Sequence, residues 1–138
     1  MNHTVQVAPL RRGSRWAAVG AAAYILWGLL HLGLGVAMAV PEIAEGAAGE
    51  LEAESLMFFV CAIVFGAQAI TVGWCLNRVG DRFGYWLNLL VLGLIDAAFV
   101  AVMVLPGHVD PVGGWSGPLV WAVAAVASTV ALRRTSTR

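Results

Sequence analysis

The segment Asn77-Arg78-Val79-Gly80-Asp81-Arg82 separates two long apolar runs, 55–76 and 83–105, and contains two of the eight basic residues of the chain. A helix needs roughly 20 apolar residues to cross a bilayer, and each run has that length. Glycine within a short polar segment is typical of a turn. This hexapeptide therefore predicts a helical hairpin whose turn lies outside the hydrocarbon.

The other basic residues extend this pattern to the whole chain. All are arginines that flank two further apolar runs, 16–40 and 115–132; they are Arg11, Arg12, Arg15, Arg133, Arg134 and Arg138. The connections 41–54 and 106–114 contain no arginine or lysine. Because short loops rich in arginine stay in the cytoplasm, this alternation sets both the span count and the orientation.

We therefore predict an all-α polytopic membrane protein, with one domain over 1–138. It is a four-transmembrane-helix bundle with spans at about 16–40, 55–76, 83–105 and 115–132, and both the N and C termini are cytoplasmic. Neighbouring helices are antiparallel because the loops are short. A chain with arginine but no lysine is typical of a GC-rich bacterial genome, so we expect a multi-pass protein of the bacterial plasma (inner) membrane.

The composition supports this class. The chain is 60% hydrophobic and 12% charged, whereas a soluble domain is about 25% charged. Its arginines form no basic stripe, so nucleic acid is not an expected partner. The start of the chain also has features of a signal peptide, including Ala37-Met38-Ala39, but the run 16–40 exceeds the roughly 7–15 residues of such a segment. A retained helix is the favoured interpretation.

Two ionisable residues fall inside the predicted spans, His31 and Asp96. Each lies nine residues before the end of its span, which places both at one depth, about 13–14 Å below the outer boundary. Asp96 in hydrocarbon is expected to keep its proton unless a cation faces it, and His31 could supply that cation. We predict a His31–Asp96 contact that could relay protons or bind a cation or a polar head group.

A structural interpretation of the same residues stays open. In it, His31 donates to a backbone carbonyl, and neutral Asp96 bonds to a neighbouring helix. Such contacts serve helix association alone, at about 0.6 kcal/mol each. A separation beyond about 8 Å, or side chains that face lipid, would remove the pairing hypothesis.

Further candidates for a pocket or a helix contact share the His31 face of the first span or lie in neighbouring spans. Small residues on such a face let another helix approach closely. Aromatic stripes are usually packing, and amides within spans usually hydrogen-bond between helices. These candidates are Tyr24, Trp27, Gly28, Gly35, Gln68 and Asn88.

The sequence gives no catalytic, cofactor or metal signature. Cys61 and Cys75 lie on one predicted helix about 21 Å apart, beyond disulfide reach. The outer loops contain five glutamates together with His108 and Asp110, but no recognised metal-ligand spacing, so a solvated acidic loop is the favoured interpretation. We expect no cofactor, no metal and no catalytic residue.

Three functional hypotheses follow. The first is a small non-enzymatic membrane protein, an accessory subunit or homo-oligomer, whose partners are the lipid bilayer and other membrane subunits. The alternative is a small transporter or proton-coupled carrier that uses His31 and Asp96. The third is a protein that interacts with membrane lipid or quinone, and it depends on the same two residues.

Overall fold

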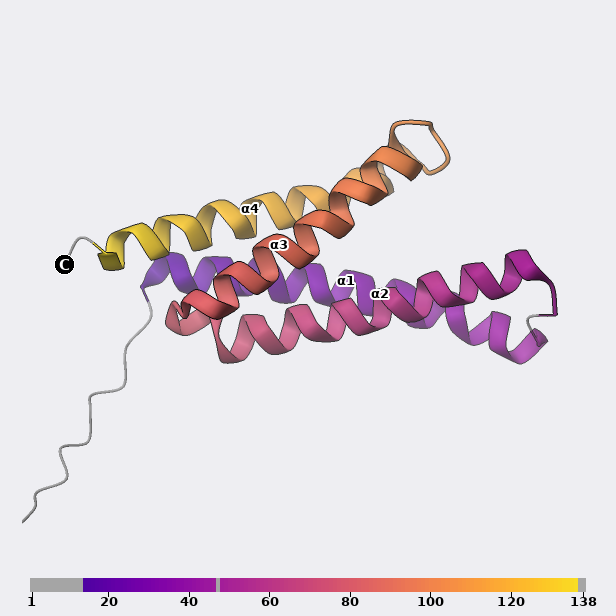
Figure 1. The fold of residues 1–138 in the computed structure, drawn as a ribbon, viewed down its shortest axis with the longest axis horizontal. Helices are drawn as coiled ribbons and strands as arrows, with labels where there is room; N and C mark the ends of the chain where they lie inside the picture. The colour runs from indigo at the N-terminus through magenta and orange to yellow at the C-terminus, as the bar shows by residue number, and fades with distance from the viewer. Residues whose placement is uncertain (1–13, 47, 137–138) are drawn as a thin grey trace, which may run out of the picture.

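The computed structural model describes residues 14–46 and 48–136, which form helices joined by short turns (Figure 1). Four long helices, α1 (Arg15–Glu45), α2 (Glu50–Cys75), α3 (Arg82–Phe99) and α4 (Pro111–Ser136), alternate in direction. A 3-10 turn, η1 (Asn77–Val79), follows α2, and a π-helical segment, η2 (Val100–Val104), extends α3. Within these described ranges there is no strand. The all-α prediction is confirmed.

All four helices are long and apolar enough to cross a membrane. α1 packs most extensively against α2 and α4, while α3 packs against α4 and α2, so α1 and α3 lie diagonally across the bundle. The helix termini define two ends. The end with Arg15, Arg78, Arg82, Arg133 and Arg134 is called the arginine end, and the end with Glu42, Glu45, Glu50, Glu52 and Glu54 is called the glutamate end.

Glycines bring α1 and α2 into backbone contact. A Cβ atom at Gly28 would lie 2.6 Å from the carbonyl oxygen of Gly66, and one at Gly66 would lie 2.7 Å from that of Gly28. At Gly35 the same atom would lie 2.8 Å from the carbonyl oxygen of Phe59. The two backbones approach this closely only because the side chains are absent, which is how small residues strengthen helix packing in lipid.

Helices α1 and α2 are called the first hairpin, and α3 and α4 the second. Both helices of the first hairpin are longer than the predicted spans. α1 continues through Pro41 to Glu45 and ends at Gly46 with a φ of 72°, and α2 already begins at Glu50. Proline lacks the N–H that would bond to the carbonyl of Ala37, and its ring crowds that carbonyl, but the residues after it keep their own N–H groups and stay helical. The predicted loop 41–54 was therefore wrong, and the connection is confined to 46–49.

α4 also begins earlier than predicted. Its first residue is Pro111, a position where proline is favoured, and the Asp110 carboxylate accepts a hydrogen bond of 2.7 Å from the N–H of Gly113. Pro118, which is near the start of the predicted span 115–132, therefore lies in the interior of the helix. Its missing N–H leaves the carbonyl of Gly114 without its helical partner.

The two hairpins diverge toward the glutamate end (Figure 1). Gly117 of α4 lies against His31 of α1, but Gly114, one turn farther along, lies against Val104 and Val109 of its own hairpin. Gly35, one turn beyond His31, lies against α2.

Substitution of Gly28 tests the glycine packing. We expect Gly28→Ala to lower the free energy of unfolding by about 1–3 kcal/mol, because the added methyl group meets backbone that cannot move aside. Gly33→Ala on the same helix is the matched control, since a Cβ there would have no atom within 4 Å. Alanine should stabilise that position by up to about 1 kcal/mol. Thermal unfolding in detergent, followed by circular dichroism, measures both; equal effects would contradict the packing.

Candidate functional site

Trp27 joins the two diagonal helices. Its side chain is fully buried at 0% exposure, and its indole Nε1 donates a hydrogen bond of 3.0 Å to Oδ2 of Asp96 on α3. Asp96 is itself buried, at 3% exposure. An ionisable side chain in an apolar interior persists only when it is paired, and the indole supplies that pairing from across the bundle.

His31 lies one turn farther along α1 and stacks on Trp27. The two ring centroids are 3.6 Å apart and the ring planes differ by 18°. Nδ1 of His31 lies 2.8 Å from the backbone carbonyl oxygen of Trp27. A carbonyl can only accept, so Nδ1 must carry a proton and donate it. In neutral His31 the other ring nitrogen, Nε2, is therefore a base.

Gly117 of α4 completes this arrangement. A Cβ atom there would lie 2.9 Å from Cε1 and 3.4 Å from Nε2 of His31, and 3.6 Å from Oδ1 of Asp96. Nε2 and Oδ1 can therefore be no more than about 7 Å apart. Both side chains face the backbone of Gly117, and His31 packs on it so closely that a Cβ atom would not fit. Trp27, His31, Asp96 and Gly117 together are called the His31–Asp96 site.

The direct contact predicted between His31 and Asp96 is not formed. Among the described residues, Asp96 bonds to Trp27 and His31 bonds to the Trp27 carbonyl, so the indole stands between them. Counting along the spans placed His31 and Asp96 at the same depth in the bundle. The structure agrees with this, because both side chains lie close to Gly117. The two hydrogen bonds of the structural interpretation, a histidine bonded to a carbonyl and an aspartate bonded to a neighbouring helix, are present as well.

The chemistry of the site follows from its two remaining polar atoms. Neither Nε2 of His31 nor Oδ1 of Asp96 has a hydrogen-bond partner in the described part of the chain. The first can accept a proton, and the second can accept or donate one according to the state of the carboxyl group.

The other predicted candidates on α1 separate into two groups. Tyr24, one of the largest fully buried side chains, lies in the core cluster with Trp27. Its hydroxyl group has no partner among the described residues. Gly28 and Gly35 instead face the backbone of α2, so they form a helix contact and do not line the His31–Asp96 site.

Gln68 and Asn88 meet on the arginine side of the core. Nε2 of Gln68 donates to Oδ1 of Asn88 at 3.5 Å, a distance at the weak limit of hydrogen bonding. Asn88 is fully buried, and the buried Asn77 lies beside it. These amides link α2, η1 and α3, and they do not contact the His31–Asp96 site.

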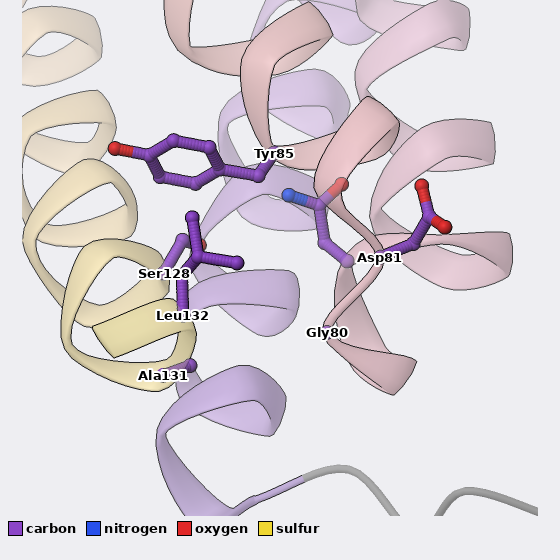
Figure 2. Close-up of a pocket in the computed structure, with 7 residues that line it drawn as sticks. Gly80, Asp81, Tyr85, Ser128, Ala131 and Leu132 are labelled. Carbon is purple, nitrogen blue, oxygen red and sulfur yellow. The ribbon is translucent and has the colours of Figure 1, made fainter. Parts of the chain in front are cut away.

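A small pocket opens at the arginine end, where the turn after η1 meets α3 and α4 (Figure 2). Tyr85 lies at its rim, and the hydroxyl groups of Tyr85 and Thr129 are hydrogen-bonded at 3.0 Å. The guanidinium groups of Arg78 and Arg134 lie over the rings of Trp74 and Trp16, at 4.5 and 5.5 Å. The pocket is lined by Asn77, Gly80, Asp81, Tyr85, Ser128, Ala131 and Leu132.

The glutamate end has carboxylates but no metal cluster. Ser55 donates a hydrogen bond of 3.0 Å to Glu42, and Glu42, Glu45 and Glu52 border a shallow pocket. Within residues 14–46 and 48–136, no group of three or more ligating side chains could hold a metal ion. Cys61 and Cys75 are free thiols on the surface of α2.

Sequence reasoning did not identify Trp27 as the partner of Asp96, nor Gly117 as part of the site. One signal for Trp27 was available, because it is a tryptophan deep in a span, whereas such rings prefer the membrane interfaces. Gly117 gave no signal, since it stands among other glycines close to a predicted loop.

No family model matches this chain, and neither a curated protein nor a solved structure matches it. The class of protein is therefore defined by the fold and the site alone. It is an all-α protein with four helices apolar enough to span a membrane and a buried polar site where the two hairpins meet.

A double-mutant cycle tests the Trp27–Asp96 hydrogen bond. We expect Trp27→Phe and Asp96→Leu to show a coupling energy of about 0.6–1.7 kcal/mol, the range measured for hydrogen bonds between membrane helices. Unfolding in mixed micelles with increasing denaturing detergent gives the free energies. Trp121→Phe serves as the control, because its indole nitrogen has no partner to lose and its cost should be smaller. Strictly additive effects would contradict the bond.

Proposed function

We propose that this protein is an integral membrane protein of the bacterial inner membrane and works there as a small proton-coupled carrier. In this proposal the four helices span the bilayer with the arginine end in the cytoplasm, where the positive-inside rule places it. The glutamate end then faces outward, and both termini are cytoplasmic.

The observation that supports a carrier is the pair of unpaired polar atoms beside Gly117. A base nitrogen of His31 and a carboxyl oxygen of Asp96 both lie close to Gly117, and His31 is several turns from either end of α1. Polar groups at such depth are costly, and in membrane proteins they mark proton relays and substrate sites. Helix association alone would not need a second unpaired atom on each residue.

The hypothesis of a homo-oligomer or accessory subunit loses part of its argument. Small residues on helix faces would favour that hypothesis, and three glycines of α1 on such faces make their close contacts within the chain. Gly28 and Gly35 pack on α2, and Gly20 packs on Ser128 of α4. The carrier is therefore the function that the arrangement supports best.

Protons from the cytoplasm would reach the His31–Asp96 site through the core of the bundle. Tyr24 lies two turns from His31 toward the arginine end, and its buried hydroxyl lacks a partner in the described residues. Buried groups of this kind are usually satisfied by internal water. The pocket between Tyr85 and Ser128 lies farther along the same direction. A few water molecules could thus connect the cytoplasm with the site.

Reporter fusions test the orientation. We expect a reporter enzyme that is active only outside the cytoplasm to be active when fused after Gly46 or Gly107, and inactive when fused after Gly80. All three positions are turns with positive φ, so the fusions leave the helices intact. Activity at Gly80, or inactivity at both other sites, would contradict the topology.

Proton movement tests the carrier. In vesicles that contain the protein and a trapped pH-sensitive dye, a potassium diffusion potential should drive protons inward faster than in empty vesicles. Asp96→Asn should reduce the protein-dependent rate by about a hundredfold, because a positioned proton-transfer group contributes at least that much.

Asp110→Asn is the matched control for this measurement. It removes a carboxylate at the glutamate end while keeping an oxygen that can accept the hydrogen bond from Gly113, so the proton flux should not change. Wild-type vesicles that acidify no faster than empty ones, or an Asp96→Asn variant that retains the full rate, would disprove the carrier.

A further inference from the structure

At the arginine end, a guanidinium group is held over a tryptophan ring. The guanidinium carbon of Arg78 lies 4.5 Å from the centre of the Trp74 ring, within the roughly 6 Å at which a cation and an aromatic ring attract each other. Trp74 belongs to the last turn of α2 and is 58% exposed. Arg134 of α4 lies over Trp16 of α1 in the same way, at 5.5 Å. Two different pairs of elements therefore place an arginine over an exposed indole at this end.

The direction of the Arg78 side chain is unusual for the end of a helix that spans a membrane. Long basic side chains at such ends normally extend outward, so that their charge reaches water. Because α2 runs toward the arginine end, Trp74 lies one turn closer to the apolar part of the helix than Arg78. Tryptophan rings prefer the interface of the bilayer. The guanidinium group over this ring is therefore held at the level of the lipid head groups.

The charges at the arginine end favour an anionic ligand. The described residues place five arginines at this end and only one carboxylate, that of Asp81. This carboxylate accepts the N–H of Gly84 at 2.9 Å, at the start of α3. The glutamate end has five glutamates and, within the described ranges, no arginine. An anionic lipid is therefore attracted to one end of the bundle and repelled from the other.

The chemistry of the guanidinium group selects among the lipid head groups. It presents five N–H donors in a planar fork that can bind two phosphate oxygens at once, and such charge-assisted hydrogen bonds are stronger than those between neutral groups. A zwitterionic head group also brings a cation, which the neighbouring arginines repel. An acidic phospholipid brings the phosphate without that cation, and its chains stay in the hydrocarbon beside the exposed indole.

We propose that the Arg78–Trp74 pair is a binding site for the phosphate of an acidic phospholipid in the leaflet at the arginine end. The guanidinium group binds the phosphate oxygens, and the indole holds the guanidinium group at that level. The inference rests on the proposed insertion of the helices into a membrane and not on the carrier function. It assigns the affinity to one arginine and the ring beside it, and not to the summed charge of this end.

Native mass spectrometry tests the site. The protein in an uncharged detergent and 0.15 M ammonium acetate is titrated with phosphatidylglycerol, and phosphatidylcholine with the same acyl chains is the reference lipid. At this ionic strength, charges more than about 8 Å apart are largely screened. We expect the first phosphatidylglycerol to bind about tenfold more tightly than phosphatidylcholine, the factor given by a hydrogen bond to a charged group. Glycerol phosphate, which has no acyl chains, should not compete at the same concentration.

Three variants at exposed positions connect the affinity with the pair. Arg78→Gln should raise the dissociation constant of phosphatidylglycerol about tenfold. Trp74→Leu keeps the charge but removes the ring, and should raise the constant by about two- to fivefold, the factor given by an exposed cation–π contact. Arg82→Gln is the matched control, since it removes the same charge from the same turn. Among the described residues Arg82 lies over no ring, so the constant should change less than about twofold.

Several outcomes would overturn the site. They are equal affinities for the two lipids, equal losses in Arg78→Gln and Arg82→Gln, and competition by glycerol phosphate, which would make the ligand a free phosphate. These results are separate from those that test the proposed function. The reporter fusions decide whether the helices span a membrane, and the proton flux decides whether the protein is a carrier. A correctly inserted, proton-conducting protein without the lipid preference would reject this inference alone.

Discussion

The hydrogen bond from the Trp27 indole to the Asp96 carboxyl is the interaction on which the arrangement of the two hairpins depends. It is the polar link between α1 and α3, the helices that lie diagonally in the bundle. A carboxyl group buried among apolar side chains has few partners available, and the free energy of leaving it unpaired is high. The bond therefore fixes the level at which α3 stands against α1, and with it the position of the site.

The first hairpin gives this site a rigid base. Gly28, Gly35 and Gly66 bring the α1 and α2 backbones into direct contact, and dispersion between closely packed backbones favours association in lipid, where no hydrophobic effect drives it. α1 also packs on α4. The helix that carries both Trp27 and His31 is thus held from two sides, so the rings keep their stacked geometry.

The four helices could be predicted from the sequence because the rules for apolar runs of membrane-spanning length are simple. Four apolar runs need four helices to satisfy their backbone groups, and arginines restricted to alternate connections gave the order of the turns. The helix ends were less predictable. Pro41 directly follows the predicted span 16–40 and Pro118 lies near the start of the span 115–132. Proline removes one helical hydrogen bond and bends a helix, but α1 and α4 both continue through these residues.

The candidate site was predictable in its level but not in its contacts. Counting from the span ends placed His31 and Asp96 at one depth, and both do border Gly117. A linear pattern gives the height of a residue on its helix, but the rotation of one helix against another depends on packing. That rotation turned Trp27 toward Asp96 and brought Gly117 to both side chains. The amides Gln68 and Asn88 illustrate the same limit. The sequence indicated them as pocket or helix-contact candidates, and the structure places them in contact with each other on the arginine side of the core.

The two hairpins differ in how firmly their backbones are held, and the difference falls at the site. Asp96 is followed after one turn by the π-helical segment η2, a rare form that is frequent at functional positions. Gly117 is followed by Pro118, which leaves the Gly114 carbonyl without its helical bond. Both features belong to the hairpin of α3 and α4 and lie within one turn of Asp96 or Gly117, whereas Pro41 of α1 lies more than two turns beyond His31. The residues that α3 and α4 contribute to the His31–Asp96 site are therefore the ones next to irregular backbone.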